Sequence, residues 1–111
     1  MRAILRQDEH IEVVGEAANG LEAIQENERL RPDLIILDVS MPVVDGLTAA
    51  GVIRKDFPHT AILLFSLHDA RSLVEAAKRL GLEGCVSKDE GDTALLEAVH
   101  AVLHKQTYFR S

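Results

Sequence analysis

The sequence predicts one α/β domain, in which a doubly wound parallel sheet lies between two layers of helices. Three observations carry this prediction. Residues 34–37 and 61–65 are apolar runs, typical of strands that are buried on both faces. Leu73, Ala76, Ala77 and Leu80 repeat at the spacing of one helical face. Strand-like and helix-like segments alternate throughout, which favours parallel strands with right-handed crossovers.

The first third of the chain is expected to contain a helix end, a strand and a helix. Residues 1–7 resemble the end of a helix, with Ile4 and Leu5 on its buried side. Residues 11–17 form an apolar segment that favours a strand. Asn19-Gly20 then marks a turn, and the helix that follows it should end before Pro32.

The rest of the chain predicts three more strands and three more helices. The expected strands span residues 34–38, 61–66 and 84–87, and the expected helices span about 46–55, 69–80 and 92–105. Asp69 suits a helix N-cap and Gly81 a helix end. Asp45 is interpreted as the N-cap of the helix that starts at Gly46, rather than as a metal ligand.

Composition excludes several classes of protein. The chain has 18 acidic and 12 basic residues and a net charge of −6, which argues against nucleic acid binding by this segment itself. It has one cysteine, Cys85, and so no internal disulfide, which fits a reducing cytoplasm. No apolar stretch reaches the roughly 20 residues that span a membrane, and the first residues do not form a signal peptide. We therefore expect a cytoplasmic protein with no membrane partner.

Polar side chains stand at the ends of three expected strands: Asp38, Ser66 and Lys88. The carboxyl ends of parallel strands share one edge of a sheet, where open α/β sheets bind their ligands. A carboxylate, a hydroxyl and an ammonium at such an edge suit phosphoryl transfer to Asp38, with Ser66 and Lys88 on the phosphate oxygens. Each residue alone is a weak signal, because strand-end aspartates often cap helices and loop lysines are usually solvated.

The order of these motifs is specific. Asp38-Val-Ser-Met-Pro-Val-Val-Asp45-Gly46 is followed by a strand that ends in serine and a strand that ends in lysine. With this order, the chain resembles the receiver domain of bacterial two-component response regulators over essentially all of its length. Residues 11–20 and Ser87-Lys88-Asp89 are similar to the subfamily that is fused to a LuxR-type helix-turn-helix DNA-binding domain.

The resemblance implies a flavodoxin-like fold and a signalling role rather than an enzyme. Asp38 would accept a phosphoryl group from a sensor histidine kinase, and Ser66 and Lys88 would contact it. Mg²⁺ is the expected cofactor, held by Asp38 and the backbone carbonyl of Ser40. Transcription would be regulated through a DNA-binding output domain, which these 111 residues do not include.

The chain departs from the family at its start. Receivers begin with a strand that ends in an acidic pair, which anchors the metal, and no such strand precedes the helix over residues 1–7. Asp8-Glu9 follows that helix, so it belongs at the opposite edge of the sheet and cannot replace the pair. We therefore expect weak Mg²⁺ binding and slow phosphorylation of Asp38 in this chain.

A missing interior strand also has structural consequences. The family strand order 2-1-3-4-5 would leave residues 11–17 detached or force them beside residues 34–37, exposing apolar surface. A homodimer or a domain-swapped oligomer would cover that surface. A truncated chain or a misassigned start is at least as good an explanation of the missing strand as natural loss.

Two single-residue differences from the family leave an alternative function open. Cys85 replaces the tyrosine or phenylalanine that reports phosphorylation in the family, and Leu67 is bulkier than the small residue usual there. A pseudo-receiver that binds proteins without phosphorylation is therefore the alternative function. A haloacid-type phosphatase is disfavoured, because Ser40 stands where a second aspartate would be needed.

Overall fold

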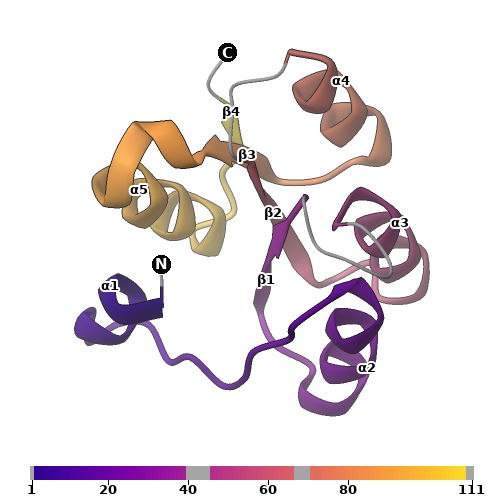
Figure 1. Ribbon diagram of the computed structural model, residues 1–111, viewed down its shortest axis with the longest axis horizontal. Coiled ribbons are helices and arrows are strands. Elements are labelled where there is room, and N and C mark those ends of the chain that lie inside the picture. The colour runs from indigo at the N-terminus through magenta and orange to yellow at the C-terminus, as the bar shows by residue number, and fades with distance from the viewer. Residues whose placement is uncertain (1, 40–45, 67–70, 110–111) are drawn as a thin grey trace.

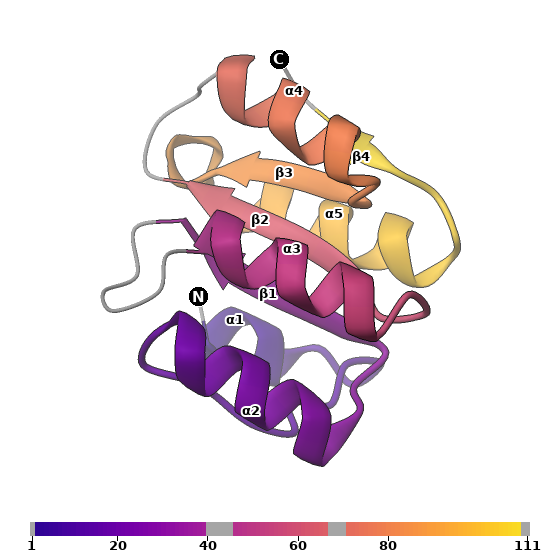
Figure 2. The ribbon, with the colours of Figure 1, turned by 90° about the vertical axis from the view of Figure 1, so that its right-hand side faces the viewer.

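The structure is a computed structural model that describes residues 2–39, 46–66 and 71–109. A four-stranded parallel sheet lies between two layers of helices (Figure 1). Helices α1 and α5 cover one face of the sheet, and α2, α3 and α4 cover the other (Figure 2). In chain order the elements are α1 (Arg2–Gln7), α2 (Gly20–Leu30), β1 (Leu34–Asp38), α3 (Gly46–Asp56), β2 (Ala61–Ser66), α4 (Arg71–Leu80), β3 (Gly84–Ser87), the 3-10 helix η1 (Lys88–Glu90), α5 (Gly91–Leu103) and β4 (Tyr108–Phe109).

The core consists of two apolar clusters, one on each face of the sheet. Leu64 of β2 contributes to the cluster under α2, α3 and α4, and Leu63 to the cluster under α5 and α1. Both side chains are fully buried, as expected for the alternating faces of a central strand. Burying a leucine contributes roughly 1.5–3 kcal/mol to stability, so β2 and its neighbours form the stable centre of the fold.

Most of the predicted elements are confirmed, and the sequence signals for their ends act as expected. The side chain of Asn19 accepts a hydrogen bond from the Glu22 N–H at 2.9 Å and caps α2. Gly81 follows α4 with φ of +76°, a left-handed conformation that favours glycine. Asp69, predicted to cap α4, and Asp45, predicted to cap α3, lie outside the described residues.

The predicted strand over residues 11–17 is wrong. These residues follow an irregular path and pair with no strand in the part of the chain that the structure describes. Their two ends are fixed elsewhere: the N–H of Ile11 bonds the Asp8 carbonyl at 3.1 Å, and the N–H of Ala18 bonds Glu22 Oε1 at 3.3 Å. With no partner strand at hydrogen-bonding distance, strand-like residues alone do not form a strand.

The position of β1 in the sheet also differs from the position that its sequence pattern predicts. Residues 34–37 read as an interior strand, yet β1 lies at an edge of the described sheet, which has the order β1-β2-β3-β4. Leu34, Ile35 and Ile36 are consequently only half-buried, and Leu37 alone is fully buried. At the other edge, β4 is a strand that the sequence did not predict; it pairs parallel to β3.

Candidate functional site

The carboxyl ends of three neighbouring strands bring Asp38, Ser66 and Lys88 to one edge of the sheet. In the parallel register, Asp38 of β1 lies opposite Phe65 and Ser66 of β2 lies opposite Ser87. Lys88 follows Ser87 directly and begins η1. Neighbouring strands run about 4.8 Å apart, so the backbones of the three predicted residues converge as the sequence indicates.

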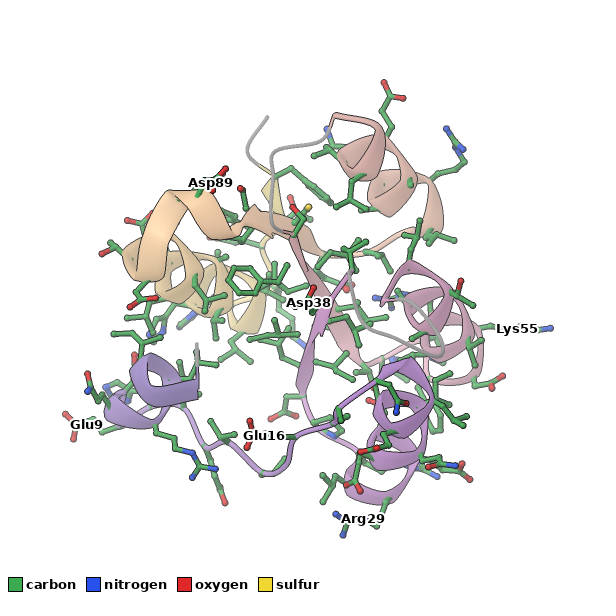
Figure 3. All side chains as sticks on the ribbon, in the orientation of Figure 1. Glu9, Glu16, Arg29, Asp38, Lys55 and Asp89 are labelled. Atoms are coloured by element: carbon green, nitrogen blue, oxygen red, sulfur yellow. The ribbon has the colours of Figure 1, made fainter. Side chains whose placement is uncertain are left out.

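Asp38 sits where β1 ends and is partly exposed, whereas Ser66 is buried with 7% exposure. Figure 3 shows Asp38 at the carboxyl end of β1. The side chain of Lys88 and the whole of Ser40, the predicted backbone metal contact, lie outside the described residues, as does Leu67. The structure therefore places Asp38 and Ser66, but not the two remaining groups of the predicted set.

Gly46 fixes the start of α3 against the end of β1. A Cβ atom at this position would lie 2.8 Å from the carbonyl carbon of Asp38 and 2.9 Å from the Cα of Val39. Only glycine allows this approach of helix to strand. The close contact brings the first turn of α3 beside the backbone of Asp38, so Gly46 helps to shape the site, a role that the prediction did not assign to it.

Ser87 is a second site-building residue that the sequence analysis missed. It is buried, and its Oγ accepts a hydrogen bond from the N–H of Asp89 at 3.2 Å. This turn starts η1 and orients the backbone at Lys88. The available signal was the serine two residues before Asp89, a spacing typical of such side-chain turns.

Asp8 lies far from this edge, as predicted. Its Oδ2 is 2.7 Å from Nε2 of His100, one turn before the end of α5. Helix α5 starts beside the carboxyl ends of the strands, after η1, and runs back to the opposite edge, where Figure 3 shows Glu9. The hydrogen bonds from His100 and from the N–H of His10 hold the pKa of Asp8 below its usual range.

The described residues do not form a metal site. No group of three or more histidine, cysteine, aspartate or glutamate side chains among them is arranged to hold an ion. His100 and His104, which have a zinc-compatible spacing, use their rings otherwise: Nδ1 of His104 is 2.6 Å from the His100 carbonyl. Of the two predicted metal contacts, Asp38 alone lies among the described residues, and Mg²⁺ needs several oxygen contacts.

Cys85 is buried in β3 at 6% exposure, within the cluster under α2, α3 and α4. It packs there as a small side chain among apolar neighbours.

Comparisons with known proteins agree with this architecture. A family model described as the response regulator receiver domain matches residues 1–100. The oxygen regulatory protein NreC of Staphylococcus epidermidis is 39% identical over 106 residues, which cover 95% of this chain and 49% of that protein. The transcriptional regulatory protein DegU of Brevibacillus brevis is 32% identical over 108 residues, covering 97% and 46%.

Solved structures share the fold. The isolated REC domain of RcsB from Salmonella enterica serovar Typhimurium, solved in the presence of phosphomimetic BeF3⁻, has a TM-score of 0.88 and 28% identity, covering 99% of this chain and 82% of that one. A LuxR-family response regulator from Aurantimonas has a TM-score of 0.86 and 30% identity, covering 96% and 76%. The chain spans about half the length of the curated relatives it matches, 46–52% of DegU, NreC and the Rhizobium johnstonii protein MctR.

Among the described residues, no helix has the length and apolar character needed to cross a bilayer.

Proposed function

Because this chain belongs to the response regulator receiver domain family, we propose that it serves two-component signalling by accepting a phosphoryl group on Asp38. The observation that carries the proposal is the strand register, in which β1, β2 and β3 end side by side at Asp38, Ser66 and Ser87, and Lys88 follows Ser87 directly. Phosphoryl transfer needs an acceptor oxygen and polar groups around the phosphorus, and these three residues supply them.

The chemistry follows from the residue types. A carboxylate oxygen of Asp38 attacks the phosphorus of a phosphohistidine, the P–N bond breaks, and the imidazole of the kinase keeps the electron pair. The product is an acyl phosphate on Asp38. The hydroxyl of Ser66 donates a hydrogen bond to a phosphoryl oxygen, and the ammonium of Lys88 offsets its charge.

Receiver domains generally bind Mg²⁺. Asp38 and the carbonyl of Ser40 are the groups that the sequence offers for it, and among the described residues no group of three or more histidine, cysteine, aspartate or glutamate side chains could hold an ion. We therefore propose that these 111 residues bind Mg²⁺ weakly and are phosphorylated slowly.

The test is labelling with a small phosphodonor, with and without Mg²⁺, read by intact mass and by hydroxylamine sensitivity of the product. We expect slow labelling that depends weakly on Mg²⁺ and maps to Asp38. Asp38→Asn should abolish the label. Asp33→Asn, at the opposite end of β1, should keep it. Labelling of Asp38→Asn at the rate of the unmodified chain would contradict the assignment, and fast, strongly Mg²⁺-dependent labelling would contradict the weak site.

A second function is favoured by Cys85 and by the absence of a carboxylate cluster among the described residues. In it, the chain is a pseudo-receiver that binds proteins without phosphorylation. Complete failure to label, in a folded chain that still binds its partner, would favour this function over the first.

Partners and output belong to the same proposal. A sensor histidine kinase is the proposed phosphodonor, and transcription the proposed output, through a DNA-binding domain of a longer protein. NreC, DegU and RcsB, the relatives that support this, carry regulatory names, and one RcsB structure contains "two RcsB dimers bound to two parallel DNAs". We propose that this chain also forms a homodimer, which light scattering would test.

A further inference from the structure

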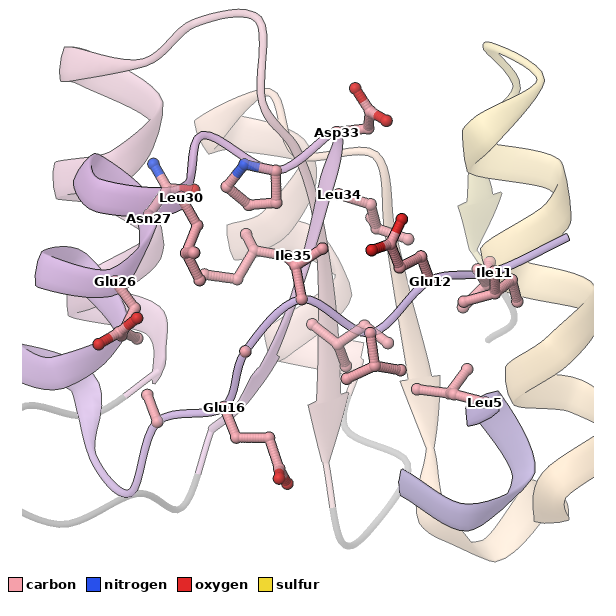
Figure 4. A pocket seen from close by; sticks show the side chains of 18 of the residues that line it. Leu5, Ile11, Glu12, Glu16, Glu26, Asn27, Leu30, Asp33, Leu34 and Ile35 are labelled. Atoms are coloured by element: carbon pink, nitrogen blue, oxygen red, sulfur yellow. The ribbon is translucent and has the colours of Figure 1, made fainter. Parts of the chain in front are cut away.

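Strand β4 closes the sheet at the β3 edge with only two residues, Tyr108 and Phe109. Figure 2 shows β4 along the outer side of β3, close to α4. The β1 edge is open by comparison, because Leu5, Ile11 and Leu30 line a groove of about 600 Å³ beside it (Figure 4). A two-residue strand is shorter than most strands that pair stably, so specific contacts must hold β4 in place.

Two small residues of β3 provide the seat for β4. Gly84 lies in register with Tyr108, and Cys85 lies in register with Phe109. A Cβ atom at position 84 would lie 2.6 Å from the Tyr108 carbonyl oxygen, so this approach of the two backbones requires glycine. Cys85 belongs to the apolar cluster under α2, α3 and α4, and Phe109 packs against that cluster. A large side chain at position 85 would therefore compete with the ring of Phe109 for space.

Further contacts hold residues 108–109, which we call the latch. The N–H of Tyr108 donates a hydrogen bond to the Glu83 carbonyl at 2.9 Å, and the Tyr108 side chain packs against the cluster under α5 and α1. On the other face of the sheet, the Lys78 ammonium of α4 lies 5.2 Å from the ring centre of Phe109. Because the pairing covers only two residues at a sheet edge, the latch can open locally while the rest of the sheet stays folded.

The chain that leads into the latch is fixed by the end of α5. The N–H of Gln106 donates to the Ala101 carbonyl at 2.9 Å, and the N–H of Lys105 donates to the Val102 carbonyl at 3.0 Å. These bonds confine an opening to the residues after Gln106. An open latch would consequently stay near its seat and could close again without a long search.

The latch contacts both elements that lead away from the candidate site. It pairs with the first two residues of β3, and the last residue of this strand is Ser87, about 7 Å from Cys85 along an extended chain. Lys88 follows directly. Helix α4, which contacts the latch through Lys78, is the first described element after Ser66. A displacement of the strand ends at the site can therefore reach the latch along β3 and along α4.

The order of the strands gives this displacement a direction. Asp38 belongs to β1, and the latch lies at the other end of the order β1-β2-β3-β4. Contacts of Ser66 and Lys88 with a phosphoryl group on Asp38 would draw the ends of β2 and β3 toward β1, and thus away from the latch. Resting on the proposed function, we infer that phosphorylation of Asp38 releases residues 108–109 from Gly84 and Cys85, so that the latch reports the state of Asp38.

The seat is tested without phosphorylation. Tyr108 is the only tyrosine of the chain, which has no tryptophan, so tyrosine fluorescence reports on the latch alone. Cys85→Phe fills the seat, and should raise acrylamide quenching of Tyr108 about threefold and speed exchange of its amide about tenfold. Cys85→Ala is the matched control and should leave both unchanged. Adding Phe109→Ala to Cys85→Phe should restore most of the protection, because one ring then occupies the space.

A pair of surface variants gives a second measurement, which holds if Cys85→Phe does not fold, as circular dichroism would show. Lys78→Gln removes the cation beside Phe109 and should speed exchange of the Tyr108 amide about twofold. Arg79→Gln, which removes the neighbouring exposed cation of α4, should have no effect.

The coupling to Asp38 is tested on the unmodified chain with a small phosphodonor. Mass spectrometry of the intact chain selects the labelled molecules by mass, and their fragments report exchange at the Tyr108 amide. We expect exchange about fivefold faster than in the unlabelled molecules of the same sample. Asp38→Asn, treated in the same way, should show no change.

Each outcome bears on a different claim. Labelled molecules whose Tyr108 amide exchanges no faster than in unlabelled ones would overturn the coupling and leave the proposed function intact. Equal protection of Tyr108 in Cys85→Phe and Cys85→Ala, with both folded, would overturn the seat. A chain that takes no label on Asp38 would contradict the proposed function and the coupling together, and the Cys85 and Lys78 variants would still decide the seat.

Discussion

The two edges of the sheet are closed to different degrees, and the difference does not follow local sequence preference. At the β3 edge, the two residues Tyr108 and Phe109 pair as β4, and Lys78 of α4 lies 5.2 Å from the ring centre of Phe109. At the β1 edge, the longer and more strand-like segment 11–17 stays unpaired with the sheet in the described structure. The short segment 108–109 forms a strand because the backbone edge of β3 is within hydrogen-bonding reach. The segment 11–17 has a more strand-like sequence, but it forms no strand because it is held away from β1.

At the β3 edge, the pairing of β4 depends on a close contact between the two strands, which a small substitution in β3 can break. A Cβ at Gly84 would lie 2.6 Å from the Tyr108 carbonyl oxygen and 2.8 Å from Leu63 Cδ1, so Gly84→Ala must displace β4. We expect a loss of about 1–3 kcal/mol in the free energy of unfolding, measured with urea, and faster hydrogen exchange of the Tyr108 amide.

The open edge supplies the matched control. A Cβ at Gly15 would meet only the end of a flexible side chain, Leu30 Cδ1 at 2.5 Å, which can turn away. Gly15→Ala should therefore change stability by no more than about 0.5 kcal/mol. Equal losses in the two variants would show that the β1 edge is as tightly closed as the β3 edge, and the comparison would fail.

The same contrast explains what the sequence could and could not predict. β2 and β3 are mostly apolar up to the serine that ends each of them, and Gly81 ends α4, so these elements follow from local composition and turn chemistry. The strand over residues 11–17 failed because a strand needs a partner, and pairing is a property of the whole chain. Tyr108 and Phe109 carried no alternation long enough to predict β4, which forms because Gly84 lets its backbone approach.

The residues of the candidate site likewise fall into those that the sequence predicted and those that it did not. Asp38 and Ser66 were predicted from the rule that parallel strands end at one edge, and the register agrees. Gly46 and Ser87, which shape the backbone around them, were not predicted as site residues. Their roles depend on distances between segments: the approach of α3 to β1 and the turn that Ser87 makes with Asp89.

One asparagine within α2 and the asparagine that caps this helix sharpen the comparison at the open edge of β1, which α2 contacts. Asn27 is 1% exposed, and neither of its amide atoms has a hydrogen-bond partner in the described structure. Replacing a buried, unsatisfied amide with an apolar side chain of similar size is stabilising, so Asn27→Leu should raise the free energy of unfolding by about 1 kcal/mol.

Asn19, by contrast, makes the N-cap bond to Glu22, and Asn19→Ala should lower the free energy of unfolding by about 1 kcal/mol. The two variants should thus shift the urea midpoint in opposite directions. A loss of stability in Asn27→Leu would mean that the Asn27 amide is satisfied, and that α2 is better packed beside β1 than the structure indicates.

The smallest expected effect concerns Asp8, which anchors the start of the segment that stands off from β1. His100, the larger cause, and the N–H of His10 lower the pKa of Asp8 from its usual 3.8. A carboxylate with a depressed pKa in the folded state binds protons more weakly than in the unfolded chain. Its contribution to stability is therefore fully present above pH 3.8 and is lost as the pH falls through the lower, folded value.

Asp8→Asn should accordingly reduce the urea midpoint slightly at about pH 6, and the difference from the unmodified chain should shrink towards about pH 3. Glu9→Gln removes the adjacent exposed carboxylate, leaves the His10 and His100 contacts in place, and should follow the unmodified chain at both pH values. If Asp8→Asn also frees segment 10–17 to close on β1, the amides of Leu34–Asp38 should gain protection from hydrogen exchange. Unchanged protection would show that the Asn19 end of the segment is enough to hold it apart, because the cap of α2 is intact in this variant.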